Sequence, residues 1–363
     1  MKRLLIFNPE NDLALASGGR SFTPPAAAVR LAEACCLLPC WWAEEGDVIF
    51  APAAQAKVAK AIEQQGLSCR IATADVLVSI DVCLPWGWSE HTVRCLRDAG
   101  VPERALVQDA ELLRQLSHRR VGEIQVRERL GLEPAMEVSD AKTLDKVLGD
   151  DFQDWLAKVP WSCSGRGVVM FEGLTRDYAL FQARGIIRRQ GSVILERKLE
   201  RKADFAALFY CRKGVGVSFL GWSVFLTEKT RYMGNVVCPQ GRMEELLGKI
   251  CSVEEAKSWV SRLETALAVY AESYEGPMGV DMMVLEDGSI YPCVEVNMRR
   301  TMGHVAMDAA SRLERLEGFP ETMDGQAHYV VKATVDGLDA DSPYPFLDAV
   351  SAGFVERMII GDV

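Results

Sequence analysis

The stretch GVDMMVLEDGSIYPCVEVNMRR, from Gly279 to Arg300, decides the fold of this chain. Two apolar runs flank a central Glu-Asp-Gly-Ser turn, a pattern typical of a β-hairpin. Glu295 and Asn297 are two residues apart, so both side chains project from the same face of their strand. Whether Asp281 on the other strand joins them depends on the length of the turn.

Two loop lengths give two different pairings of the strands. A two-residue loop, Asp287-Gly288, would pair Asp281 with Val294 and place the two acids on opposite faces. A three-residue loop, Asp287-Gly288-Ser289, pairs Asp281 with Glu295 directly. The second register is favoured because it gathers the apolar residues on one face, where they can pack on a core. Those residues are Met282, Val284, Pro292, Val294 and Val296.

In this register Asp281, Glu295 and Asn297 present two carboxylates and an amide oxygen at one place. Such an oxygen-only set suits Mg²⁺ that is held together with substrate phosphates. The alternative is the solvated outer face of an ordinary edge hairpin. Arg299 and Arg300 follow at once and favour the metal interpretation. A transferring phosphoryl group needs both metal and guanidinium groups to neutralise its charge.

The first hundred residues alternate between strands and helices. Strands are expected in RLLIF, GDVIFAP, SCRIAT and SIDVCLPWG, and helices in PPAAAVRLAEACCLL, AAQAKVAKAIEQQG and SEHTVRCLRDAG, the last with a Ser89 N-cap. This alternation predicts an open, mostly parallel sheet. No Gly-x-Gly-x-x-Gly follows the first strand, so a standard dinucleotide site is not indicated. Asn8, Asn11 and Asp12 follow it instead, where open α/β sheets bind ligands, although a capping role fits equally.

The remainder of the chain predicts a mixed fold. One long helical stretch is expected over residues 110–131, and antiparallel strands broken at Lys213-Gly214 over 203–229. A long amphipathic helix follows Ser252, with Glu255 at the capping-box position. After the hairpin we expect a helix from about Met302 and a strand over 328–337. The tryptophan pairs at 41–42 and 86–88 suit domain-interface packing better than ligand stacking.

The composition excludes several classes of function. The net charge of −10 argues against a general nucleic-acid binder, because phosphate neutralisation needs clustered Lys and Arg. The N-terminus resembles a strand rather than a signal peptide, and no apolar run approaches the ~20 residues that span a bilayer. Eleven cysteines without metal-site spacing indicate reduced thiols in a cytoplasmic protein. A Cys163 nucleophile would need a neighbouring histidine, and none of the four is placed to serve.

A phosphate site is indicated before the hairpin, in WLAKVPWSCSGRGVV. Lys158 lies in an apolar strand, and a lysine that faces phosphates explains this placement better than a solvated one. Gly165 and Gly167 allow backbone N–H groups to approach phosphate oxygens. The alternative is a plain flexible hairpin, and the spacing is not that of a Walker A loop.

With these motifs the sequence resembles the ATP-grasp superfamily, mostly ATP-dependent carboxylate–amine ligases, from roughly Leu113 to Val331. The resemblance implies an ATP-grasp fold, α/β and α+β, preceded by an N-terminal open parallel α/β domain. Asp281, Glu295 and Asn297 fall in the Mg²⁺-ligand positions, for two ions, which Mn²⁺ could replace. Arg299 falls where many members have an arginine that acts on the developing acyl phosphate.

The resemblance also implies the nucleotide contacts. Lys158 would bind the phosphates, and the loop with Ser164, Gly165 and Gly167 would close over them. Arg119 or Arg120 takes the place of the family's second phosphate-binding lysine. The remaining members of the expected site lie on the adenine and ribose side; they are Glu196, the backbone at Arg197, Lys198 and Leu199, and the acid Asp204.

We expect a ligase that activates a carboxylate as an acyl phosphate for attack by an amine or thiol, with ATP and Mg²⁺. A kinase for a small hydroxyl acceptor and a non-catalytic ATP-binding module are the alternatives. We expect the acceptor site to be lined by Arg231, Tyr232, Asn235 and Arg300. The alternative for the segment around Tyr232 is an ordinary loop. No nucleic acid or membrane partner is expected; dimers are common in the family, and a homodimer stays open.

Four regions are expected. They are an N-terminal α/β domain (1–110), a small lid subdomain (111–198), a large subdomain with the hairpin (199–335) and a C-terminal extension (336–363).

Overall fold

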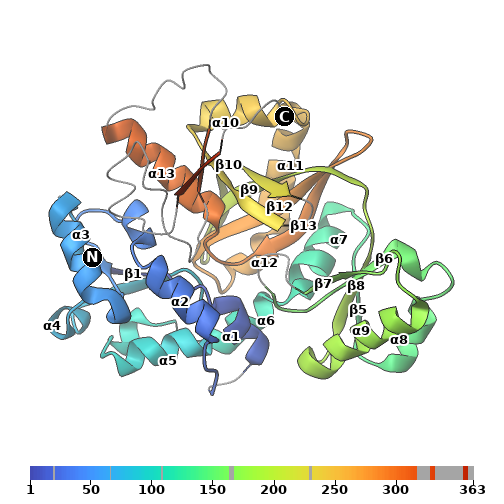
Figure 1. Ribbon diagram of the computed structural model, residues 1–363, viewed down its shortest axis with the longest axis horizontal. Coiled ribbons are helices and arrows are strands. Elements are labelled where there is room, and N and C mark those ends of the chain that lie inside the picture. The colour runs from blue at the N-terminus through green and yellow to red at the C-terminus, as the bar shows by residue number, and fades with distance from the viewer. Residues whose placement is uncertain are drawn as a thin grey trace.

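A computed structural model describes residues 1–18, 21–65, 67–107, 109–162, 167–228, 231–316, 328–331 and 355–358. Its strands form three sheets, which Figure 1 shows as a blue N-terminal part, a green part and a yellow-to-orange part. The expected order, a parallel sheet followed by antiparallel ones, is confirmed. No helix among the described residues is long and apolar enough to cross a membrane.

The first sheet is parallel throughout and has the strand order β3-β2-β1-β4. Its strands are β1 (Arg3–Ile6), β2 (Val48–Ile49), β3 (Arg70–Ile71) and β4 (Val82–Pro85). The helices of this part are α1 (Asn11–Ser17), α2 (Ala26–Ala34), α3 (Gln55–Gln65), α4 (Ala74–Leu77) and α5 (Glu90–Asp98). The Ser89 side chain accepts from the Thr92 N–H, so the predicted N-cap of α5 is confirmed.

Helix α2 is shorter than predicted. It ends at Ala34 and is followed by a 3₁₀ turn over Leu38–Trp41. Pro39 in this turn has no N–H to continue an α-helix, which accounts for the early end. The cysteines around the turn are buried, and each described cysteine is a free thiol, as expected.

The helical stretch over residues 110–131 is broken into three pieces rather than continuous. They are α6 (Ala110–Leu116), a π-helix (Arg120–Val126) and α7 (Arg127–Leu130). At the break the Arg119 N–H donates to the Pro160 carbonyl, 3.1 Å away, instead of to a carbonyl within the stretch. This contact joins the helical connection to the second sheet.

The second sheet is antiparallel, with the order β5-β8-β6-β7. Its strands are β5 (Met136–Val138), β8 (Val193–Arg197), β6 (Trp155–Lys158) and β7 (Val168–Met170). Helices α8 (Ala141–Val147) and α9 (Arg176–Gln190) bury Leu144, Ala179 and Ala183 against it. Strand β6 thereby receives a rigid support, which fixes the position of Lys158.

The third sheet has the order β13-β12-β9-β10-β11-β14-β15 and is antiparallel. Its strands are β9 (Arg201–Arg212), β10 (Gly216–Glu228), β11 (Arg231–Val237), β12 (Gly276–Leu285), β13 (Ile290–Asn297), β14 (His328–Val331) and β15 (Val355–Met358). Its helices are α10 (Gln240–Leu247), α11 (Val253–Ala266), α12 (Ala268–Ala271) and α13 (Met302–Leu316). The predicted pairing of the strands around Lys213-Gly214 and the helix from Met302 are both confirmed.

Two details of the third sheet complete the comparison with the sequence. Ser252 caps α11 as predicted, but the Glu255 side chain accepts from the Ile290 N–H of the hairpin instead of closing a capping box. Helix α13 packs between the first and third sheets (Figure 1). Trp41 and Trp86 are buried there, in one apolar cluster with Val305. The expected interface role of these tryptophans is therefore confirmed.

Candidate nucleotide and metal site at the β12–β13 hairpin

The hairpin pairs Asp281 with Glu295, as the sequence predicted, but the predicted three-residue Asp287-Gly288-Ser289 loop is wrong, because Val284 pairs with Ile290. The register shifts within the hairpin, however. Between the pairs Asp281–Glu295 and Met283–Tyr291, β12 advances by two residues and β13 by four, so β13 contains a bulge. Pro292 lies in this bulge and cannot donate to the ladder. The bulge corrects one expectation, since Cys293 is fully buried while Val294 is only partly buried.

The bulge also turns the backbone of β13 toward the second sheet. The Val294 carbonyl accepts from Lys158 Nζ at 3.3 Å and from Arg127 Nη2 at 2.8 Å. The Cys293 carbonyl accepts from Arg127 Nε at 2.8 Å. The hairpin thus supplies backbone acceptors as well as acidic side chains to this region.

The two carboxylates of the hairpin lie in a strongly anionic environment. Burial and the neighbouring Glu295 raise the pKa of Asp281 to about 7, although Arg299 and a hydrogen bond from Asn297 Nδ2 (3.2 Å) oppose the rise. Burial and Asp281 also raise the pKa of Tyr232. A buried carboxyl group whose pKa is raised in this way gains from a divalent cation.

The donor set fits magnesium better than a softer metal. Within the part of the chain that the structure describes, no three His, Cys, Asp or Glu side chains form a metal cluster. Asp281, Glu295 and Asn297 offer oxygens from two acids and one amide. Such a set leaves positions for phosphate oxygens and water, as Mg²⁺ sites at phosphates do.

Lys158 ends β6 and is buried in a network of ion pairs. Its Nζ lies 2.5 Å from Glu196 Oε1 and 3.3 Å from Glu123 Oε1, and its side chain is 6% exposed. Removal of any one charge would leave a buried partner uncompensated. The network therefore places the ammonium group firmly beside the hairpin.

Of the two candidate arginines, Arg119 faces the hairpin. Its guanidinium contacts Glu123 at 2.6 Å, Glu295 at 2.9 Å and the Ser162 hydroxyl at 2.9 Å. Arg120 points elsewhere, toward Glu137, and its side chain is 44% exposed. Consecutive residues of a helical turn project in different directions, so only one of the two arginines reaches the hairpin.

The expected adenine-side residues follow the end of β8. Glu196 accepts from Lys158 and Arg127, whereas Arg197 pairs with Asp151 and stacks over Trp155. The Lys198 ammonium lies 3.1 Å from Glu172, and Leu199 continues the segment between β8 and β9. Asp204 on β9 pairs with Arg201 at 2.6 Å. Glu196 reaches the hairpin through Lys158 and Arg127, and Asp204 lies opposite Met283 of β12 in the third sheet.

The glycine loop is partly outside the described residues, since Ser164 and Gly165 lie there. Gly167 is described and has φ +97°, a conformation that favours glycine. A Cβ on Gly167 would lie 2.6 Å from Val159 Cγ2. Close packing between β6 and β7 therefore requires this glycine.

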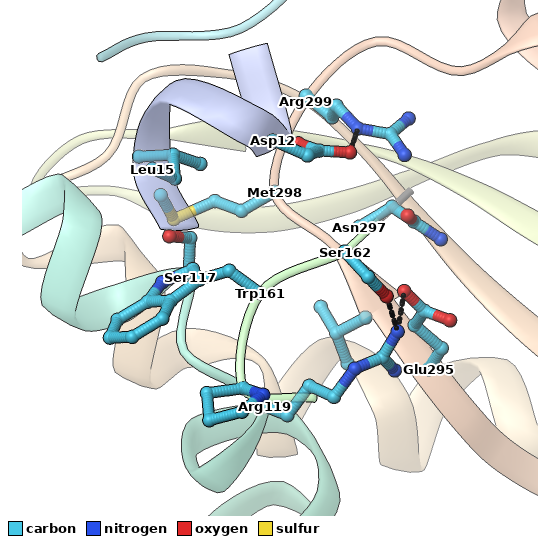
Figure 2. A pocket seen from close by; sticks show the side chains of 12 residues that line it. Asp12, Leu15, Ser117, Arg119, Trp161, Ser162, Glu295, Asn297, Met298 and Arg299 are labelled. Atoms are coloured by element: carbon cyan, nitrogen blue, oxygen red, sulfur yellow. Dashed lines mark hydrogen bonds and ion pairs between the residues drawn. The ribbon is translucent and has the colours of Figure 1, made fainter. Parts of the chain in front are cut away.

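A pocket lies between the hairpin, the first sheet and the second (Figure 2). It holds about 380 Å³ of empty space, including the part open to solvent. At one side Arg299 Nε lies 2.8 Å from Asp12 Oδ2, and at the other Arg119 contacts Glu295. Asp12, which follows the first strand, thus reaches the end of the hairpin.

The expected acceptor residues are arranged differently from this pocket. Tyr232 hydrogen-bonds to the buried Asn235, whose amide donates to Ser223 at 2.8 Å. Arg300 pairs with Asp308 and stacks over Trp42, and Arg231 begins β11. None of the four lines the described pocket.

Solved structures with a similar fold are known. The chain is similar to N5-carboxyaminoimidazole synthetase from Staphylococcus aureus in complex with ADP, at 12% identity and a TM-score of 0.51, over 86% of this chain and 76% of that one. It is also similar to the biotin carboxylase domain of 2-oxoglutarate carboxylase from Hydrogenobacter thermophilus, solved with MgADP, ADP and bicarbonate (13%, 0.52, 91% and 73%). The chain has the ATP-grasp fold.

A third structure of the same fold is N5-carboxyaminoimidazole ribonucleotide synthetase from Thermus thermophilus, at 14% identity and a TM-score of 0.51, over 91% of this chain and 83% of that one. No protein-family model and no curated protein sequence matches the chain. The structural likeness shows the fold alone.

Within this ATP-grasp fold two residues of the site were missed by the sequence reasoning. Glu123 is 1% exposed and binds both Arg119 and Lys158, while Arg127 binds Glu196 at 2.6 Å. Their spacing was the available signal. Arg119, Glu123 and Arg127 recur every four residues, which places alternating charges on one face of a helix.

Proposed function

We propose that the protein is an ATP- and Mg²⁺-dependent ligase. It would activate a carboxylate as an acyl phosphate and transfer the acyl group to an amine or thiol, with release of ADP and phosphate. One observation carries the proposal. On the hairpin of an ATP-grasp fold Asp281 pairs with Glu295, Arg119 contacts Glu295, and Lys158 contacts the neighbouring Val294 carbonyl, while Arg299 lowers the pKa of Asp281.

Each residue has a role that follows from its position. Lys158 and Arg119 bind the phosphates of ATP, in exchange for part of their present contacts with Glu123 and Glu295. Asp281, Glu295 and Asn297 would hold Mg²⁺, which neutralises phosphate charge and aligns the oxygens for transfer. Glu196 accepts from the adenine amino group, since it lies at the end of β8 on the far side of Lys158.

The reaction needs no nucleophilic side chain. A carboxylate oxygen of the substrate attacks the γ-phosphorus of ATP, and the bond from that phosphorus to the bridging oxygen of ADP breaks. The amine then attacks the acyl carbon, inorganic phosphate leaves with the bonding electrons, and the amine loses a proton to solvent. Arg299 stabilises the charge on the acyl phosphate, so the protein acts by positioning and neutralisation.

Product analysis tests the reaction class. A ligase releases ADP and inorganic phosphate with each acyl transfer. A kinase would release ADP and a phosphorylated hydroxyl compound, and a non-catalytic binder would bind Mg·ATP without turnover on any acceptor. Either result would overturn the proposed ligase.

Glu295→Gln tests the metal assignment within the same assay. We expect a loss of at least 100-fold in Mg²⁺-dependent turnover with an unchanged circular dichroism spectrum, because the variant removes one metal-binding charge and keeps the size of the side chain. Glu286→Gln, in the exposed turn of the same hairpin, is the matched control and should retain activity. Full turnover in Glu295→Gln would remove Glu295 from the metal site.

A further inference from the structure

The pocket beside the hairpin carries a balanced set of charges. Its described lining contains two acids, Asp12 and Glu295, and two arginines, Arg119 and Arg299. In the absence of ligand they form two ion pairs, of 2.8 Å and 2.9 Å. A ligand that enters the pocket must therefore offer charges of both signs or leave one of these groups uncompensated.

Binding of nucleotide and metal would separate one of the two ion pairs, Arg119 with Glu295. If the proposed function holds, Glu295 turns to Mg²⁺ and Arg119 to the phosphates. Asp12 and Arg299 then remain as the charged groups of the pocket that face the acceptor. They come from different parts of the fold, α1 and the residues after β13, and both side chains are only 13% exposed.

Arg299 cannot serve the acyl phosphate and Asp12 equally. Its Nε donates to Asp12, and its Nη1 donates to the Arg300 carbonyl at 3.1 Å. A guanidinium that turns toward a substrate carboxylate loses part of its contact with Asp12. A carboxylate at this degree of burial then needs a second cation close to the first.

We infer that the carboxylate substrate is an amino acid, with its carboxylate on Arg299 and its ammonium group on Asp12. This assignment rests on the proposed ligase function and names its substrate class. The two side chains lie in direct contact, so a carboxylate and an ammonium group on neighbouring carbons match their separation.

The apolar part of the pocket limits the side chain of the amino acid. Leu15, Trp161 and Met298 line it and are nearly buried, and Figure 2 shows them on one side of the charged groups. An apolar side chain of the amino acid would face these three residues.

The experiment measures Mg·ATP-dependent ADP and phosphate release with a panel of L- and D-amino acids and with the des-amino acid of the same carbon skeleton for each, always with hydroxylamine present as the attacking amine. With the wild-type protein, we expect at least one amino acid to be turned over with a kcat/KM about 100-fold above that of its des-amino counterpart. Equal or faster turnover of the des-amino acids would overturn the amino-acid assignment and leave the ligase function standing. Phosphorylation of a hydroxyl acceptor alone, or no turnover of any acid, would overturn both.

Asp12→Asn tests the residue that carries the assignment. It should raise the KM for the amino acid about 100-fold and leave the KM for ATP and the turnover of the des-amino acid within a few-fold. Asp98→Asn, an exposed acid at the end of α5, is the matched control and should change none of them. Should Asp12→Asn fail to fold, Asp12→Glu keeps the charge, displaces it by one methylene and should still favour amino acids. Unchanged discrimination in Asp12→Asn would exclude Asp12 as the ammonium site.

Discussion

At the scale of single residues, the buried Asp281 carboxyl group lowers the stability of the metal-free protein at neutral pH. Its pKa in the folded protein is about 7 instead of the ordinary 3.8, so between these values the folded state holds a proton that the unfolded chain has released. The metal-free protein should therefore lose stability as the pH rises from about 4 to about 7. Each unit of pKa difference corresponds to about 1.4 kcal/mol.

Asp281→Asn should remove this pH dependence. Without metal, the variant should exceed the wild type in free energy of unfolding by roughly 2–4 kcal/mol at pH 8, and by little at pH 4. Urea unfolding in the presence of a chelator measures both values. A stabilisation of the same size at both pH values would show that the Asp281 carboxylate is not the cause, and Asp98→Asn is the matched exposed control.

The residues that the sequence predicted are those whose contacts run along one strand. Glu295 and Asn297 share a face because side chains alternate along one strand, whereas the pairing of Asp281 with Glu295 depends on the bulge in β13. The partners of these residues could not be predicted in this way. Asp12 reaches Arg299 across 287 residues, and such pairs depend on how the sheets are placed. The sequence does locate Asp12 after the first strand, but without a partner.

At the scale of elements, Arg127 of α7 joins the second sheet to the third. It donates to Glu196 of β8 and to two carbonyls of β13, and its guanidinium lies 5.3 Å from the centre of the Tyr291 ring. These acceptors are buried or partly buried, so they would lose their donors without replacement by water. One side chain therefore joins the end of β8 to the β12–β13 hairpin.

Arg127→Met should lower the free energy of unfolding by about 3 kcal/mol, because the Cys293 carbonyl loses the Arg127 donor, while Glu196 and the Val294 carbonyl each keep only their contact with Lys158. Arg127→Lys should lose less, since one ammonium group can still donate to some of these acceptors. Arg129→Met, an exposed arginine in the same helix, should change the value by less than about 0.5 kcal/mol in a parallel urea titration. Equal losses of free energy of unfolding in Arg127→Met and Arg129→Met would show that Arg127 does not hold the second and third sheets together.

The elements were predictable where local signals decide and not where distant contacts do. The N-caps of α5 and α11 and the antiparallel pairing of β9 and β10 follow from Ser89, Ser252 and the Lys213-Gly214 turn. The break before the π-helix does not, because it is stabilised by the Arg119 contact with Pro160 on another sheet. The bulge in β13 had a local signal in Pro292, which cannot donate to the ladder.

At the scale of the whole molecule, the candidate site is made by all three sheets. Asp12 follows β1, Lys158 ends β6 and Glu295 lies on β13 (Figure 1). The expectation of an N-terminal parallel sheet before an ATP-grasp fold is confirmed, whereas the angle between the sheets has no signature in the sequence. A ligand that contacts residues of several sheets stabilises them together, because it binds only when they are assembled.

Mg·ADP should therefore stabilise the molecule as one unit. At a ligand concentration of 100 times Kd the expected gain is about 2.7 kcal/mol, which for a chain of 363 residues corresponds to a rise in Tm of roughly 3–4 °C. Scanning calorimetry measures this rise, with Mg²⁺ alone and ADP with a chelator as controls. We expect the chelator to abolish most of it, because the repulsion between Asp281 and Glu295 then has no metal to relieve it. A rise of the same size with and without Mg²⁺ would show that nucleotide binding does not depend on the hairpin acids. A rise confined to one of two separate transitions would show that the ligand does not stabilise the sheets as one unit.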